Sequence, residues 1–394
     1  MSDDPRPTYD LLIQGGLVID PAQGLHARRD VAVAAGRVAA VAEALPPERA
    51  RRVVDVGGCI VTPGLIDLHT HLYRGVSTLG VDVDRACLPG GVTTSVDAGT
   101  AGAITFPGLR DYCLRPARSR AYAYVNLAAI GLILDDGHEL DELRYADADS
   151  LAETIQANRD LCLGIKVRVG EEHVGSFGYA ALDRALAVAE RIGCGVMVHI
   201  TRPGVPLDGV FDRLRPGDVI THLLHGKGET IVRDGRVLAS VRRARERGVG
   251  MDVGHGMGSF AFATARAALA DGFAPLTIST DLHAFNVNGP VYDLATTLSK
   301  FLALGMSLDA VVAAATSNAA RSIGKQDELG SLAVGRAADV AVFALREGEV
   351  VLVDALGETL RAEQRLEPLL TVLGGAVVAS RLEGVAAEPV PPRG

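Results

Sequence analysis

The chain has 394 residues, of which 48% are hydrophobic and 22% charged, and its formal net charge is −9. This composition is typical of globular proteins and excludes a disordered or fibrous chain, while the length allows one large α/β barrel with an appendage. An acidic chain without a run of lysine and arginine is not expected to bind nucleic acid.

The N-terminus, Met1-Ser2-Asp3-Asp4-Pro5, is acidic and lacks the basic start and apolar stretch of a signal peptide. No apolar run reaches the roughly 18 residues that cross a bilayer, so no membrane partner is expected. The five cysteines match neither a disulfide framework nor a zinc-finger spacing, and are Cys59, Cys87, Cys113, Cys162 and Cys194. These features predict a cytoplasmic protein.

Short strand-like segments come first along the chain. Leu11–Asp20 alternates apolar and polar residues and ends in the turn Pro21-Ala22-Gln23-Gly24. Val31–Ala34 and Arg37–Val41 follow as further strand candidates on either side of Ala35-Gly36. This flank is too short to bury a core of its own.

The middle of the chain alternates β-type and amphipathic helical segments. Eight strands are predicted, over Ile60–His71, Val92–Ala98, Ala121–Leu127, Leu163–Val169, Gly195–Ile200, Val219–His222, Gly250–Val253 and Leu276–Asp281. Helical periodicity is clearest over Ala180–Ile192, Phe260–Ala270, Tyr292–Leu304 and Leu308–Arg321. Eight βα units over this length predict a closed (β/α)8 barrel, with an active site at the C-terminal ends of its strands.

The C-terminal flank is again β-rich, with strand candidates at Asp339–Ala344 and around Gly374-Gly375 in Leu370–Ser380. We expect both flanks to combine in one small β-sandwich beside the barrel. The predicted fold is therefore α/β, a (β/α)8 TIM barrel with a β-sandwich built from N- and C-terminal segments. The expected boundaries are 1–60 for the N-terminal part of the sandwich, 61–327 for the barrel, and 328–394 for the C-terminal part and the tail.

Two histidines end the first predicted barrel strand. Alternate strand residues share a face, so His69 and His71 can converge on one metal ion. Taken alone, two structural histidines near a strand end are an equal alternative.

Four more polar residues lie at or near the ends of later strands. Lys166 is on the fourth, while His199, His222 and Asp281 end the fifth, sixth and eighth. A buried lysine needs either a carboxylate partner or conversion by CO2 into a carbamate, which is an anionic oxygen ligand. Asp281 has a helix N-cap as its alternative role. Four imidazoles, one carbamate and one aspartate suffice for two divalent ions, with Zn²⁺ expected before Mn²⁺, Fe²⁺ or Ni²⁺.

Thr62-Pro63-Gly64-Leu65-Ile66-Asp67-Leu68-His69-Thr70-His71 resembles the opening signature of the amidohydrolase superfamily. The order His-x-His, Lys, His, His, Asp resembles its binuclear members with a carboxylated lysine. That resemblance implies that His69, His71 and Asp281 hold one metal ion, that His199 and His222 hold the other, and that carboxylated Lys166 bridges them.

The expected reaction is attack of a metal-bridging hydroxide on a carbonyl group, with Asp281 as the catalytic acid and base. Arg168 shares the strand parity of Lys166, and it either binds a substrate carboxylate or supports an acid near the metals. Asn126, His255 and His283 are predicted at the pocket, with a structural hydrogen bond as the alternative for each. His26, His138, His173 and His225 are assigned to loops or the surface without a role.

Asp281–Asn286, Pro290–Leu294 and Thr316–Ala320 look most like the deacetylase branch, whose members are dihydroorotase-like. Dihydroorotases have an arginine where this chain has Tyr73, and D-aminoacylases have a cysteine ligand where it has Ser95-Val96-Asp97. We therefore expect a hydrolase that removes an acetyl or other acyl group from a small carboxylate-bearing N-acyl or O-acyl substrate.

The alternative function is a cyclic amidase of dihydroorotase or hydantoinase type. A non-catalytic scaffold barrel is a third function, against which the complete ligand set argues. The expected partner is a small-molecule substrate, and a homo-oligomer stays open.

Overall fold

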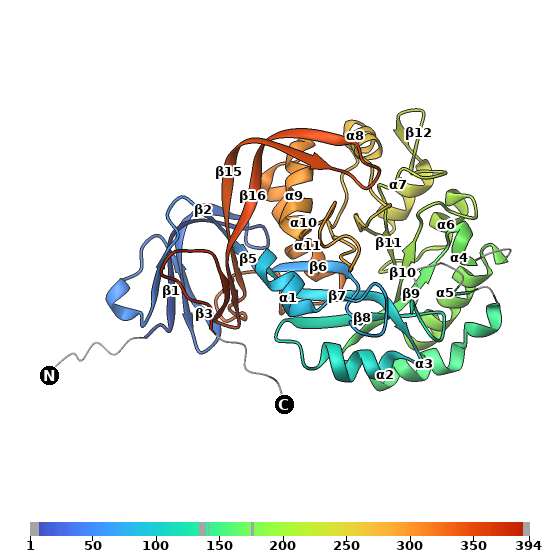
Figure 1. Ribbon diagram of the computed structural model, residues 1–394, viewed down its shortest axis with the longest axis horizontal. Coiled ribbons are helices and arrows are strands. Elements are labelled where there is room, and N and C mark those ends of the chain that lie inside the picture. The colour runs from blue at the N-terminus through green and yellow to red at the C-terminus, as the bar shows by residue number, and fades with distance from the viewer. Residues whose placement is uncertain (1–7, 134–138, 141, 175–176, 389–394) are drawn as a thin grey trace.

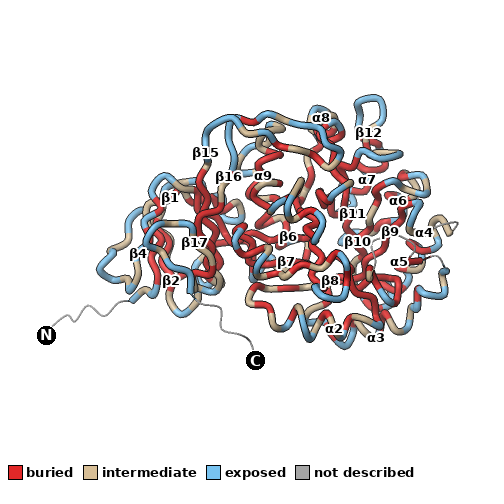
Figure 2. The backbone as a smooth tube through the Cα atoms, viewed as in Figure 1, coloured by how far each residue is buried: buried red, intermediate tan, exposed pale blue. Residues whose placement is uncertain are grey.

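The computed structural model describes residues 8–133, 139–140, 142–174 and 177–388. Figure 1 shows a β-rich part beside a larger α/β part, and Figure 2 shows that each has its own buried interior. None of the helices in the described ranges combines the length and apolar character needed to span a bilayer.

The β-rich part is one eight-stranded sheet of order β17-β16-β15-β5-β1-β2-β3, with β4 beside β1. Its strands are β1 (Leu11–Asp20), β2 (Leu25–Ala34), β3 (Arg37–Ala42), β4 (Val53–Asp55), β5 (Ile60–Pro63), β15 (Val340–Val353), β16 (Thr359–Leu373) and β17 (Ala376–Ser380). β5 joins the two ends of the chain because it pairs with β1 on one side and with β15 on the other. Apolar residues from both ends, among them Val18 and Val342, bury a common core, as predicted.

The larger part contains seven parallel strands in the order β14-β11-β10-β9-β8-β7-β6. These are β6 (Leu65–Thr70), β7 (Val92–Gly102), β8 (Arg120–Asn126), β9 (Cys162–Arg168), β10 (Gly195–His199), β11 (Val219–Thr221) and β14 (Gly250–Met251). Isolated parallel bridges from Thr277 to Asp252 and from Leu282 to Thr70 place the next segment between β14 and β6. This segment closes the ring, so the predicted barrel is confirmed.

The eighth predicted strand, Leu276–Asp281, is not a continuous strand. On the side of β6, the Asp67 carboxylate replaces the backbone ladder and accepts hydrogen bonds from the amide and the hydroxyl of Thr280. Asp281 then turns the chain with φ +52°. A buried side chain therefore does the pairing that the pattern assigned to backbone groups.

The first predicted barrel strand, 60–71, is in fact two strands in different sheets. The chain passes from β5 to β6 at Gly64, whose amide donates to the Asp339 carbonyl. A Cβ at Gly64 would lie 2.2 Å from Thr93 Oγ1, so the crossing needs glycine.

Helices cover the outside of the barrel (Figure 1). They are α1 (Val83–Cys87), α2 (Phe106–Leu109), α3 (Ala148–Ala157), α4 (Glu171–Val174), α5 (Ala180–Ile192), α6 (Leu207–Arg213), α7 (Ala239–Glu246), α8 (Phe262–Ala270), α9 (Leu294–Ala303), α10 (Leu308–Ala314) and α11 (Ser317–Ser322). The prediction of a single helix over 308–321 is wrong, because the helix is interrupted between α10 and α11. There the Ala315 carbonyl accepts a hydrogen bond from Ile66 at the start of β6.

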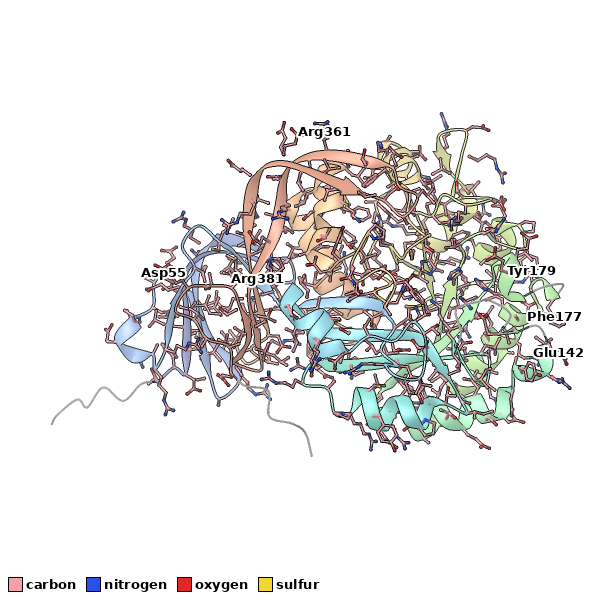
Figure 3. All side chains as sticks on the ribbon, viewed as in Figure 1. Asp55, Glu142, Phe177, Tyr179, Arg361 and Arg381 are labelled. Carbon is pink, nitrogen blue, oxygen red and sulfur yellow. The ribbon has the colours of Figure 1, made fainter. Side chains whose placement is uncertain are left out.

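The long hairpin β15–β16 extends from the outer sheet across the barrel helices, with Arg361 near its far end in Figure 3. At that end Asp354 Oδ2 accepts a hydrogen bond from the Phe262 amide, 2.9 Å away, at the start of α8. Closer to the sheet, the Leu366 amide donates to Ser299 Oγ of α9 over 2.9 Å. The C-terminal strands therefore hold two barrel helices in place.

Candidate metal centre

The barrel strands bring six predicted ligands to one cavity of about 300 Å³. Parallel strands that close into a ring present their C-terminal ends at the same face, so side chains at those ends meet there. Three lie on strands β6, β9 and β10 (His69, Lys166 and His199), two directly follow β6 and β11 (His71 and His222), and one, Asp281, ends the closing segment.

The polar atoms of these side chains lie close together. Asp281 Oδ1 is 3.2 Å from His69 Nε2 and 3.0 Å from His71 Nε2. Lys166 Nζ is 3.4 Å from His69 Nε2, and the ring centroids of His199 and His222 are 4.2 Å apart. Candidate ligand atoms of His69, His222 and Asp281 all lie within 4.8 Å of one another, a spacing that one ion can bridge.

Hydrogen bonds on the far side of each ring set which nitrogen faces the cavity. His69 Nδ1 lies 2.8 Å from Thr221 Oγ1, and the Thr221 hydroxyl donates to Asp252 Oδ2 over 2.9 Å. Because that hydroxyl proton is already used, the threonine oxygen accepts from His69 Nδ1, and the Nε2 lone pair faces the cavity.

The rings of His71 and His222 are held in the same way. His71 Nδ1 lies 2.7 Å from Thr100 Oγ1, and His222 Nδ1 donates to the Gly254 carbonyl over 2.6 Å. Hydrogen bonds of this kind orient the ligands of metal sites and leave Nε2 available to the ion.

A divalent cation fits this set of donors. The unprotonated Nε2 of His69 faces Asp281 Oδ1, so two acceptors meet with no proton between them, and His71 Nε2 faces the same oxygen. Asp281 Oδ1 is buried and has no hydrogen-bond donor among the described residues. Buried polar groups are normally satisfied, and a metal ion would satisfy all three atoms at once.

Burial sets the protonation of the cluster. It holds the pKa values of His69, His199 and His222 well below the ordinary histidine value, so these rings are neutral near pH 7. Burial also lowers the pKa of Lys166 and raises the pKa of Asp281. Neutral imidazole is the form that binds metal ions.

Two of the clustered residues have strained backbones. His222 and Asp281 adopt positive φ angles of 63° and 52°, in the left-handed region that non-glycine residues avoid. Each such residue costs on the order of 1–3 kcal/mol, and such strain is concentrated at functional sites. Close approach also matters at Gly99, where a Cβ would lie 2.4 Å from the Lys166 Cβ.

Arg168 lines the cavity but is already paired. Its Nε and Nη2 atoms donate to the two carboxylate oxygens of Glu139 over 2.5 and 2.6 Å, and both side chains are buried. Burial alone would raise the pKa of Glu139, but the guanidinium group holds it below its ordinary value. Of the two predicted roles, this geometry matches support of an acid, although that acid is Glu139 and not a metal ligand.

The other predicted pocket residues divide into two groups. His283 lines the cavity. Asn126 does not, because its amide donates to the Gly99 carbonyl and accepts from the Ala128 amide. His255 also lies away from the cavity, where its Nε2 is 2.7 Å from Lys300 Nζ.

Two histidines assigned to loops or the surface are placed differently. His173 lies on α4 and lines the cavity, with its ring centroid 5.2 Å from that of His199. His225 is fully buried, and its Nδ1 accepts from the Lys227 amide. The positions of these two histidines depend on how the chain turns after β9 and β11, and the sequence pattern does not predict those turns. His26 is exposed beside Asp309, and His138 lies outside the described residues.

Sequence reasoning missed the residues that support the cluster. Thr100, Thr221, Asp252 and Glu139 are all buried. Thr221 and Asp252 lie near the C-terminal ends of predicted strands, and this position could have identified them as residues that contact the metal ligands. Glu139 has no comparable signal, since it lies in a loop 29 positions before its partner Arg168.

Comparison with known proteins places these features among described families. The model of the amidohydrolase family matches residues 60–378. The chain is 37% identical over 349 residues to deacetylase Atu3266 of Agrobacterium fabrum, covering 88% of this chain and 86% of that protein. It is 31% identical over 373 residues to a deacetylase of Enterococcus faecalis, covering 94% and 99%. A crystal structure of a dihydroorotase is similar with TM-score 0.85 and 34% identity, covering 98% and 99%.

Proposed function

This chain belongs to the amidohydrolase family and is a hydrolytic enzyme acting on amide bonds, and from that premise we propose the bond that it cuts. It removes an acetyl or other acyl group from a small carboxylate-bearing N-acyl or O-acyl compound. The observation that carries the proposal is the meeting of Asp281 Oδ1 with two imidazole nitrogens in a cavity of about 300 Å³, which accommodates a small molecule. Relatives named deacetylase that align along most of their length support the choice of bond.

In this proposal His69, His71 and Asp281 hold one divalent ion and His199 and His222 hold a second, with zinc expected first. Bound there, the ions supply a Lewis acid for the substrate carbonyl and lower the pKa of water.

Lys166 acts as a bridging ligand after addition of its neutral amine to CO2. The ammonium group first loses one proton to give the amine; a nitrogen–carbon bond then forms and the nitrogen loses a second proton, so the neutral amine becomes an anionic carbamate. Burial, which disfavours the ammonium form, favours this conversion.

Asp281 acts as the proton carrier. Its carboxylate accepts the proton that the attacking water loses and returns it to the leaving nitrogen or oxygen as the bond breaks. Burial raises the pKa of Asp281, which makes its carboxylate a better base than an exposed aspartate.

A cyclic amidase is the second candidate, because the similar dihydroorotase structure covers nearly the whole chain. Ring opening breaks the same kind of bond. Against it stands Tyr73, at the position where dihydroorotases have an arginine.

The test is a direct comparison of substrates with the zinc-loaded enzyme. Turnover of N-acetyl amino acids and acetylated 2-hydroxy acids is expected to exceed turnover of dihydroorotate and hydantoins. Asp281→Asn serves as the matched inactive variant, since it removes the base and keeps the shape. Faster turnover of the rings would replace the first proposal with the second.

A further inference from the structure

The cavity of the candidate metal centre is lined by three permanent cations besides Lys166, namely Arg168, Arg202 and Lys227. Two of them have carboxylate partners. Arg168 is paired with Glu139, and Arg202 Nη1 lies 2.5 Å from Glu172 Oε1. Among the described residues, no carboxylate forms an ion pair with Lys227. It is thus the cavity cation whose charge the described part of the chain leaves without a counter-ion.

The ammonium group of Lys227 is placed against a glycine of the cavity wall. Lys227 lies in the loop after β11, and a Cβ at Gly258 would be only 2.5 Å from its Nζ. The missing side chain at Gly258 therefore makes room for the ammonium group beside the cavity.

Lysine at this position is itself unusual in this chain. The sequence has four lysines among its 39 basic residues, so arginine supplies nearly all of the ordinary surface cations. Lys325 is an ordinary example, paired with Glu328 three residues later in a turn. A compact ammonium group with freely rotating donors suits an anion that arrives and leaves.

We propose that Lys227 binds the carboxylate of the substrate, an inference that rests on the proposed function and assigns its recognition site. The Nε and Nη2 edge of Arg168 is already held by Glu139, whose carboxylate neutralises the guanidinium charge. Met257, which lines the same cavity and is 54% exposed, offers an apolar surface there. The substrate class is therefore the N-acyl or O-acyl derivative of a 2-amino or 2-hydroxy acid with an apolar side group.

The kinetic test compares N-acetylphenylalanine with N-acetylphenylalaninamide, in both enantiomers, so that only the carboxylate differs. In Lys227→Met the ratio of kcat/KM for the acid to that for the amide is expected to fall about 10- to 100-fold, mainly through KM. Gly258→Val is expected to lower the ratio in the same direction, because it displaces the ammonium group and keeps the lysine. Lys325→Met is the matched control and leaves the ratio unchanged.

Two kinetic results would overturn the assignment. One is an unchanged acid-to-amide ratio in Lys227→Met. The other is a fall of that ratio in Arg202→Met alone, which would give the role to an arginine released from its exposed ion pair with Glu172.

A binding arm separates failure of this inference from failure of the proposed function. N-methanesulfonylphenylalanine carries the same carboxylate but no hydrolysable acyl group, and its affinity is measured by calorimetry on wild type and Lys227→Met. Binding that weakens about 10-fold or more in the variant supports Lys227 even if no acyl compound is turned over. Equal binding to both proteins, or no binding to either, would refute it.

Discussion

His69 Nδ1 and the hydroxyl oxygen of Thr221 lie 2.8 Å apart on the side of the ring that faces away from the cavity. The Thr221 hydroxyl in turn donates to the buried Asp252 carboxylate, so a three-residue chain orients the His69 ring. Thr221→Val keeps the size of the side chain and removes both hydrogen bonds. We expect metal affinity to fall about 10- to 100-fold, as for other residues that orient metal ligands, measured by competition with a chelator. Thr221→Ser should keep wild-type affinity, and wild-type affinity in Thr221→Val would contradict the role.

Lys166 is expected to be indispensable to the metal centre. Wild type should contain about two metal ions per chain, measured by mass spectrometry, and removal of both by a chelator should abolish activity. Lys166→Ala removes the bridging ligand, so activity should be almost lost and then partly restored by a short carboxylic acid that takes its place. Full activity of Lys166→Ala without added acid would refute the carbamate.

Glu139→Gln should destabilise the fold although the two side chains have the same shape. It leaves the buried Arg168 guanidinium without its counter-ion, and loss of one partner of a buried ion pair costs about 3–5 kcal/mol of unfolding free energy. Glu172→Gln, in the exposed pair with Arg202, should cost about 0–1 kcal/mol and serves as the control in denaturant titrations. Equal effects of the two substitutions would show that the Glu139–Arg168 pair contributes no more to the free energy of unfolding than an exposed ion pair.

Lys300 predicts a pH-dependent stability. Burial lowers its pKa to about 7, whereas an unfolded lysine titrates near 10.4, so between these values the unfolded chain binds a proton that the folded chain has lost. Stability therefore rises with pH in this window, by roughly 2–3 kcal/mol from pH 7 to 9. Lys300→Met should remove the part of this rise that Lys300 contributes, seen as a smaller difference between denaturation midpoints at the two pH values. The half-buried Lys325, which pairs with Glu328, is the control, so Lys325→Met should retain the rise, and a wild-type slope in Lys300→Met would exclude Lys300 as its source.

Hydrophobic periodicity predicted the fold well because it reports which face of each segment is buried. Helix α5 has the predicted bounds, Ala180–Ile192, and the outer sheet joins both ends of the chain as expected. Errors occurred where single polar contacts replace regular pairing. The crossing at Gly64 and the closing segment at Asp281 both depend on hydrogen bonds to residues distant in the sequence, Asp339 and Asp67.

The candidate site shows the same division. Ligand-type residues at strand ends, such as His69 and Lys166, could be selected from the sequence because strand ends in a barrel converge, and their assignment as metal ligands stays a prediction. What surrounds them depends on loops. Glu139 neutralises Arg168 and His173 lines the cavity, and no local pattern reports either arrangement.

The hairpin β15–β16 has a consequence for synthesis on the ribosome. The first amide of α8, at Phe262, finds its acceptor in Asp354, which is translated 92 residues later. Likewise, the hydroxyl oxygen of Ser299 on α9 accepts a hydrogen bond from the amide of Leu366, which is translated later. The barrel helices next to the closing segment therefore reach their final hydrogen bonding only after hairpin β15–β16 has been synthesised. A product terminated after residue 327 would have all barrel strands but no acceptor for that amide, which makes it a natural substrate for quality-control proteases.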